Sequence, residues 1–135
     1  MANALYDKGR EKFLTGAINW TGDNIKAVLV DAADYTVNIS THEFLSDIPS
    51  GARVATSGNM SGKSATAGVA DCDDFAFGAV TGDPCEIIVF YKDTGTDTTS
   101  PLISYHDNAT GLPVTPNGGD INIQIDSGSN KLFKL

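Results

Sequence analysis

The sequence predicts a mainly β domain, and three observations support that prediction. Short runs rich in β-branched residues recur along the 135 residues, separated by Gly, Asp, Asn, Thr, Ser and Pro. Fourteen glycines suit the many turns of such a fold, because glycine tolerates positive φ. Residues 120–126 alternate apolar and polar side chains, as a strand with one buried face does. We expect one domain, residues 1–135, folded as an antiparallel β-sandwich or jelly-roll-like structure with a short N-terminal helix and one short inserted helix.

The first element is predicted to be a short helix over residues 4–15, within an N-terminal segment, 1–16, that is helical or arm-like. Three of the nine basic residues are clustered in five consecutive positions, 8–12, of this helix. They either balance the acidic residues beside them on a solvated face or form a basic surface that docks on an acidic partner. The contact surface would consist of Tyr6, Lys8, Arg10, Lys12 and Phe13.

The next element, residues 24–32, reads as a central strand. Ile25, Ala27 and Leu29 fall on one face, while Val28 and Val30 fall on the other, and apolar residues on both faces indicate a strand that is covered on both sides.

The inserted helix is predicted to begin near Ser40. Ser40 and Glu43 have the spacing of a capping box, and Pro49 would end the helix.

The second half of the chain supplies most of the remaining strands. Residues 75–80 and 86–91 are expected to form a hairpin, and the second of these runs is the most apolar in the chain. Residues 59–68 read as a loop or a weak edge strand. The other expected strands are 53–57, 102–106, 120–126 and 131–135.

The two cysteines, Cys72 and Cys85, would flank this hairpin. In that register they lie about 27 Å apart at the rise of a β-strand, whereas the Cα atoms of a disulfide lie within about 7 Å. An intrachain disulfide is therefore disfavoured. The thiols are either reduced, as is usual for a protein made in a cytoplasm, or form an intersubunit disulfide after release into an oxidising medium.

Several patterns typical of chemistry are incomplete. Residues 57–64 resemble a phosphate-binding loop but lack its first glycine and the helix that should follow. Asp71, Asp73 and Asp74 could offer oxygen ligands to Ca²⁺, but they do not have EF-hand spacing. His42 and His106 are the only histidines, and no nucleophile elbow accompanies them. We expect no catalytic residue, no metal and no cofactor.

The net charge of −8 excludes some partners. A protein that binds duplex DNA needs basic surfaces to displace counterions, so we expect no nucleic acid. An acidic surface disfavours anionic membranes, and no run of about 20 apolar residues is available to span one. Nothing in the sequence resembles a secretory signal, so we expect synthesis in a cytoplasm.

Four stretches together carry a family resemblance. They are residues 4–20 (ALYDKGR through to Trp20), 25–31 (IKAVLVD), 41–49 (THEFLSDIP), and 111–120 (GLPVTPNGGD) running on to 131–135 (KLFKL). The chain resembles, from end to end, small virion structural proteins of tailed bacteriophages, of the capsid decoration or cement type. The resemblance implies a protein of the capsid surface that is made in the host cytoplasm, binds the major capsid protein and bridges capsomers. It also implies self-association as a homodimer or homotrimer, and no enzymatic activity.

Two other functions remain open at this stage. A tail, neck or head-fibre component of the same virion would use the same core at few sites per particle. A carbohydrate- or host-surface-binding module would bind glycans as the isolated protein and would be absent from virions.

Overall fold

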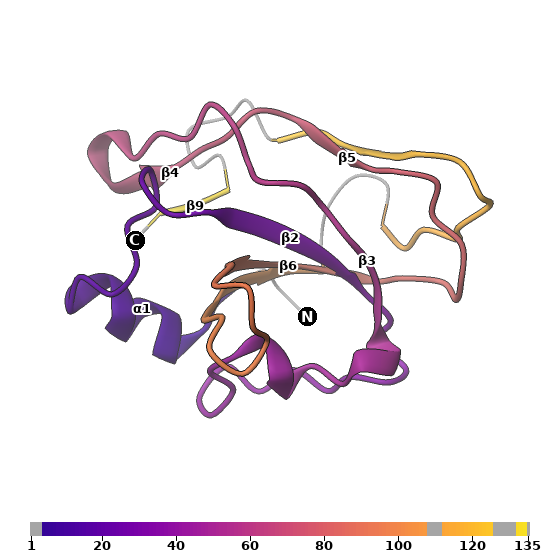
Figure 1. Ribbon diagram of the computed structural model, residues 1–135, viewed down its shortest axis with the longest axis horizontal. Coiled ribbons are helices and arrows are strands. Elements are labelled where there is room, and N and C mark those ends of the chain that lie inside the picture. The colour runs from indigo at the N-terminus through magenta and orange to yellow at the C-terminus, as the bar shows by residue number, and fades with distance from the viewer. Residues whose placement is uncertain (1–3, 108–111, 126–131, 135) are drawn as a thin grey trace.

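The computed structural model describes residues 4–107, 112–125 and 132–134, and it confirms the mainly β class with one α-helix. At its centre lies a five-stranded antiparallel sheet in the order β1-β7-β6-β2-β3 (Figure 1). Its strands are β1 (Ala4–Leu5), β2 (Ile25–Val30), β3 (Arg53–Thr56), β6 (Ile87–Lys92) and β7 (Leu102–His106).

Two separate antiparallel ribbons cover one face of this sheet. One pairs β4 (Val69–Ala70) with β9 (Phe133–Lys134), and the other pairs β5 (Phe75–Phe77) with β8 (Ile121–Ile123). In Figure 1 both ribbons lie above β2 and β6. Residues 121–125 alternate between half-buried isoleucines and exposed polar side chains, which confirms the predicted pattern.

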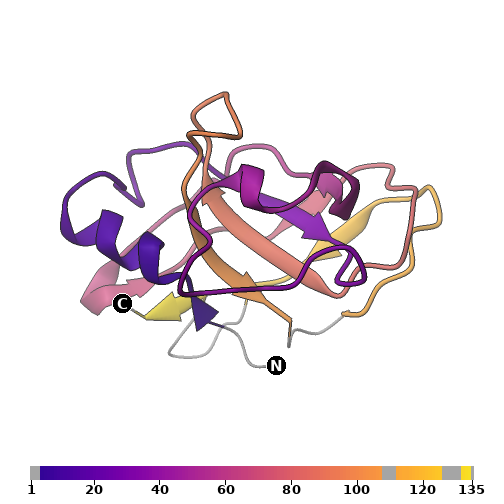
Figure 2. The same ribbon diagram turned by 90° about the horizontal axis from the view of Figure 1, so that it is seen from below.

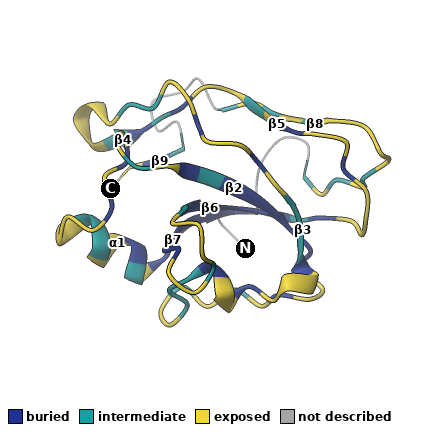
Figure 3. Ribbon diagram, in the orientation of Figure 1, coloured by how far each residue is buried: buried dark blue, intermediate teal, exposed yellow. Residues whose placement is uncertain are grey.

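The central strand β2 is covered on both faces, as predicted. Ile25, Ala27 and Leu29 belong to the core beneath the ribbons, and Val28 and Val30 belong to a second core on the opposite face. All five are fully buried (Figure 3). The double pattern therefore indicated correctly that the strand lies in the middle of the sheet.

The second core is closed by the segment 35–52, which crosses the sheet in front of β6 in Figure 2. The segment holds two single-turn 3₁₀ helices, η1 (Leu45–Asp47) and η2 (Ser50–Ala52). The inserted helix, predicted to begin near Ser40 and to end at Pro49, forms only as the single turn η1, and Ser40 does not cap it. The Asn38 side chain accepts hydrogen bonds from the N–H groups of residues 40 and 41, and the Asp47 carboxylate accepts those of residues 43 and 44, so these side chains cap turns in place of a continuous helix.

The N-terminal helix α1 (Asp7–Leu14) is shorter than predicted, because the residues before it form β1 and pair with Tyr105 and Ser104 of β7. Asn3, which from its type and position we would expect to cap this helix, lies outside the described residues. Gly9 brings α1 very close to β7: a Cβ atom there would stand 2.6 Å from the backbone oxygen of Leu102. Residues 4–14 are therefore packed on the sheet and do not project as an arm.

The predicted hairpin is also wrong. β5 pairs with β8, while β6 pairs with β2 and β7. Between β5 and β6, the N–H of Val80 donates to the Gly119 oxygen and Cys85 pairs with Val114, so this segment runs beside residues 112–119 and does not turn back on itself. The strongly apolar β6 needs neighbours on both edges and cover on both faces, and only the centre of the larger sheet provides them.

The single η3 turn (Thr66–Gly68) completes the described elements. None of the described helices is long and apolar enough to cross a membrane.

Candidate functional site

The basic residues of α1 are partnered by acidic neighbours. Lys8 lies 3.5 Å from Glu11, and Arg10 lies 3.5 Å from Asp7, each one turn away on the same helix. Exposed ion pairs of this kind contribute about 0.2–1 kcal/mol, so a partner could displace them at little cost. The helix thus presents balanced charge.

Lys12 is held more firmly than the other two. Its Nζ atom donates to Oε2 of Glu43 at 2.8 Å and lies 5.2 Å from the centre of the Phe44 ring. Both side chains of this ion pair are less than one-third exposed. The pair links α1 to the segment that closes the second core.

Tyr6 does not belong to the contact surface that was predicted from the sequence. Its side chain is fully buried, and its hydroxyl lies 2.8 Å from that of Tyr35, which lies 2.8 Å from Nδ1 of His42. Burial raises the pKa of Tyr6 far above its usual value and that of Tyr35 to about 12. The sequence placed Tyr6 within the predicted helix, but the residue precedes the helix and belongs to the second core.

Phe13 borders a hollow at the end of α1, which we call the α1 pocket. Its volume is about 450 Å³, and it is lined by Phe13, Gly16, Ile18, Asn19, Trp20, Thr21, Ala65, Gly68, Ala70 and Phe133. The Phe133 ring packs edge-on against the Trp20 ring, with 5.4 Å between the ring centroids. It is tilted relative to the Phe13 ring, and the centroids of these two rings lie 6.3 Å apart. Trp20 is 5% exposed and donates its Nε1–H to the Asp71 oxygen, so its ring offers no open face for stacking on a sugar.

Cys72 and Cys85 are free and buried. Burial, together with nearby carboxylates, raises the pKa of the Cys72 thiol to about 12 and that of Cys85 to about 11. Because disulfide formation requires an accessible thiolate, the fold opposes the intersubunit disulfide that the sequence left open.

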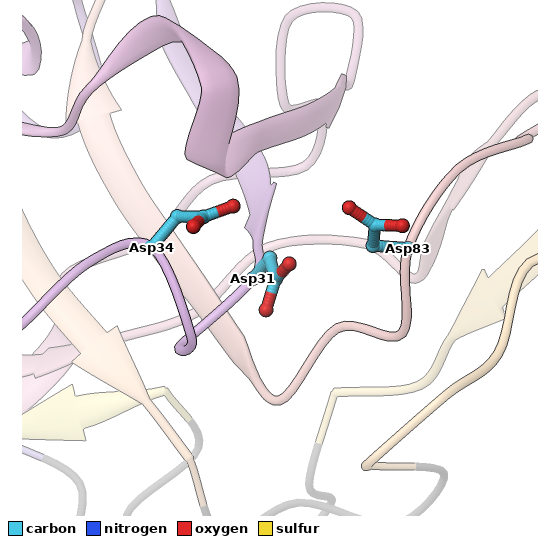
Figure 4. A group of neighbouring side chains, drawn as sticks. All are labelled: Asp31, Asp34 and Asp83. Carbon is cyan, nitrogen blue, oxygen red and sulfur yellow. The ribbon is translucent and has the colours of Figure 1, made fainter.

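An acidic cluster that the sequence did not indicate lies where β2 ends. Asp31, Asp34 and Asp83 bring carboxylate oxygens within 4.8 Å of one another, and Asp31 is 6% exposed (Figure 4). The spacing of Asp31 and Asp34 is a local signal, but Asp83 lies far along the chain and could not be foreseen beside them. Ca²⁺ takes six to eight oxygen ligands, so three carboxylates would satisfy only part of its coordination.

The acidic residues that the sequence did single out have other partners. Asp71 accepts from the N–H of Cys72, Asp73 from the Ser61 hydroxyl, and Asp74 from the N–H of Ile125. Asp73 and Asp74 each tie their segment to a distant part of the chain, whereas the bond to Asp71 is local.

The two histidines lie on opposite faces of the sheet. His42 contacts Tyr35 in the second core, whereas His106 bonds to Ser104 at 3.0 Å and packs edge-on to Phe90 in the first core. Burial lowers the pKa of His106 to about 4. The structure does not assemble the two rings into one site.

The phosphate-loop pattern has a structural explanation. Lys63, which would contact a phosphate, donates instead to the backbone oxygen of Asp23, and only the single turn η3 follows.

No known family model matches this chain. No curated protein matches it either.

Proposed function

We propose that this chain is a structural protein of a tailed-bacteriophage virion that decorates the capsid exterior and stabilises the major capsid protein lattice by bridging capsomers. The proposal rests on the sequence resemblance. One structural observation supports it: three of the four resembling stretches meet around α1. Lys12 pairs with Glu43 of the stretch 41–49, and Trp20 packs against Phe133 of the stretch 131–135.

The architecture is suited to such a role. A cement protein acts by docking, and a lattice that repeats one site many times makes a modest contact persistent. Here α1 is fixed to β7 at Gly9 and to the segment 35–52 through Lys12, so a surface built on α1 keeps its shape. Pre-organisation of this kind lowers the entropic cost of binding.

The docking surface that we propose contains Lys8, Arg10, Lys12 and Phe13, without the buried Tyr6. The Lys8 and Arg10 side chains are 40% and 51% exposed. An acidic capsid surface would replace their weak pairs to Glu11 and Asp7 with contacts across the interface.

The first test is the copy number in purified particles, measured against the major capsid protein. A ratio near one, or a simple fraction of it, supports the decoration role. A handful of copies per particle would assign the chain to a tail, neck or head fibre. Complete absence from the particle would overturn the virion proposal and favour a binding module.

The second test measures how purified protein occupies particles that lack it. Deleting residues 2–15 is unsuitable, because the deletion removes β1, buried Tyr6 and the packing of Gly9. The double variant Lys8→Glu and Arg10→Glu leaves these in place and should lower occupancy. Lys26→Glu is the control, since it reverses one basic charge and breaks an ion pair, to Asp93, outside α1. Equal occupancy by both variants would refute the α1 surface.

A further inference from the structure

A row of three polar side chains joins the start of the chain to the segment 35–52. The Tyr6 hydroxyl lies 2.8 Å from the Tyr35 hydroxyl, which lies 2.8 Å from Nδ1 of His42. Both tyrosines are buried, and His42 is half-buried. Within the described part of the chain, neither hydroxyl bonds to any other group. Each hydroxyl proton must therefore be accepted inside this row.

A backbone N–H fixes the direction in which the row donates. The N–H of Asn38 donates to Nδ1 of His42 across 3.4 Å, and a backbone N–H cannot accept. Nδ1 therefore keeps its lone pair, so the Tyr35 hydroxyl donates to it and the Tyr35 oxygen accepts from Tyr6. All three side chains are satisfied only when His42 is neutral and carries its proton on Nε2.

A second proton on His42 reverses the row. Both nitrogens of an imidazolium donate, so Nδ1–H would face the Asn38 N–H and would donate to the Tyr35 oxygen. Tyr35 would then have to donate to Tyr6, and the Tyr6 proton would lose its only acceptor. Because Tyr6 is fully buried, water cannot replace that acceptor, and the unpaired hydroxyl carries a desolvation cost.

The charged groups near His42 do not repair this loss. The Asp47 carboxylate attracts a charged imidazole, but its hydrogen bonds go to backbone N–H groups of its own segment and not to Tyr6. Glu43, next to His42 in the chain, is already paired with Lys12. The neighbouring tyrosines stay neutral, since burial raises the pKa of each: Tyr6, Tyr35 and Tyr105.

We propose that protonation of His42 is a switch that loosens the segment 35–52 and uncovers the second core at mildly acidic pH. The segment supplies Tyr35, Leu45, Ile48 and Ala52 to this core, so its opening exposes apolar side chains of the central sheet. Histidine is the side chain whose charge ordinarily changes between pH 5 and 8. This inference does not rest on the virion proposal.

Amide hydrogen exchange of the full chain at pH 7.5 and 5.5, corrected for the intrinsic effect of pH on exchange, tests the switch. In peptides from 35–52, the opening constant should rise by about fivefold or more at pH 5.5, because the unpaired Tyr6 hydroxyl disfavours the closed form with charged His42. His42→Gln keeps an acceptor for Tyr35 but cannot gain a proton, so it should lose this response.

His106→Gln is the matched control. His106 packs against Phe90 in the other core, and its pKa of about 4 keeps it neutral at both pH values. This variant should therefore respond to pH as the wild type does.

The nitrogen chemical shifts of His42 in the wild type test the direction of the row without any substitution. At pH 7.5 they should show the tautomer with the proton on Nε2, and a proton on Nδ1 would overturn the proposal. Two exchange results would also overturn it: equal opening of 35–52 at both pH values in the wild type, or a full pH response that persists in His42→Gln.

Discussion

Replacing Gly9 with alanine should destabilise the protein, although alanine favours a helix. The new Cβ would stand 2.6 Å from the Leu102 oxygen, 3.1 Å from the Ile103 oxygen and 3.2 Å from the Ile103 Cα. All three atoms are backbone atoms of β7, which is bonded to strands on both edges and cannot move aside. The helix must therefore shift away from the sheet.

The expected magnitude follows from two opposing terms. Overpacking in a well-packed interior costs about 1–3 kcal/mol. Alanine in a helix returns about 1 kcal/mol relative to glycine. A contact below 3.0 Å with rigid backbone belongs at the upper end of the first range, so we expect a net loss of about 1–2 kcal/mol.

Equilibrium unfolding in urea measures this loss as a lower midpoint at an unchanged slope. Gly51→Ala is the matched control, because no atom lies within 4 Å of its Cβ position and its φ is not positive. That variant should be neutral or more stable by up to about 1 kcal/mol. If Gly9→Ala were as stable as Gly51→Ala, the close packing of α1 on β7 would be refuted.

Three further predictions concern buried polar groups. Tyr6→Phe removes the hydroxyl that bonds to Tyr35 and should cost about 0.5–1.5 kcal/mol in urea unfolding; an unchanged midpoint would contradict the buried bond. The pKa of His106 is lowered on folding to about 4, below the unfolded value of about 6.5, so its contribution is complete above pH 6.5 and is lost as the pH falls toward 4. The slope attributable to it should reach up to about 1.4 kcal/mol per pH unit, and His106→Gln should flatten it; the same slope in both proteins would refute the assignment. Because Cys72 and Cys85 are buried with raised pKa values, a thiol reagent at pH 8 should modify the native protein far more slowly than the urea-unfolded chain, and equal rates would show that the thiols are accessible.

The sequence predicted best where a pattern depends on one strand alone. The apolar pattern of β2 predicted burial on both faces, and the alternation in residues 121–125 predicted burial on one face. Both predictions are confirmed. These patterns reflect how many faces of a strand are covered, which is a local property.

Pairing between strands could not be predicted in the same way. The two runs of the expected hairpin are separated by a stretch with turn residues, yet Val80 and Cys85 bond to the segment 114–119. Which strands pair depends on the contacts that all strands of the sheet make together. The sequence between two strands carries little information about whether those two strands pair. The same holds for the acidic cluster, whose members meet only in the folded chain, and for the α1 pocket, whose walls come from three separate segments.

The order of the strands also constrains how the chain acquires its structure during synthesis. β2 and β3 are near in sequence and can pair early, but β1 has no partner in the central sheet except β7, about a hundred residues later. Until residues 102–106 have left the ribosome, β1 lacks the strand with which it pairs and α1 lacks the backbone on which Gly9 packs. We therefore expect nascent chains that stop before β7 to be cut readily by proteases near the N-terminus, and chains that extend beyond it to be protected there.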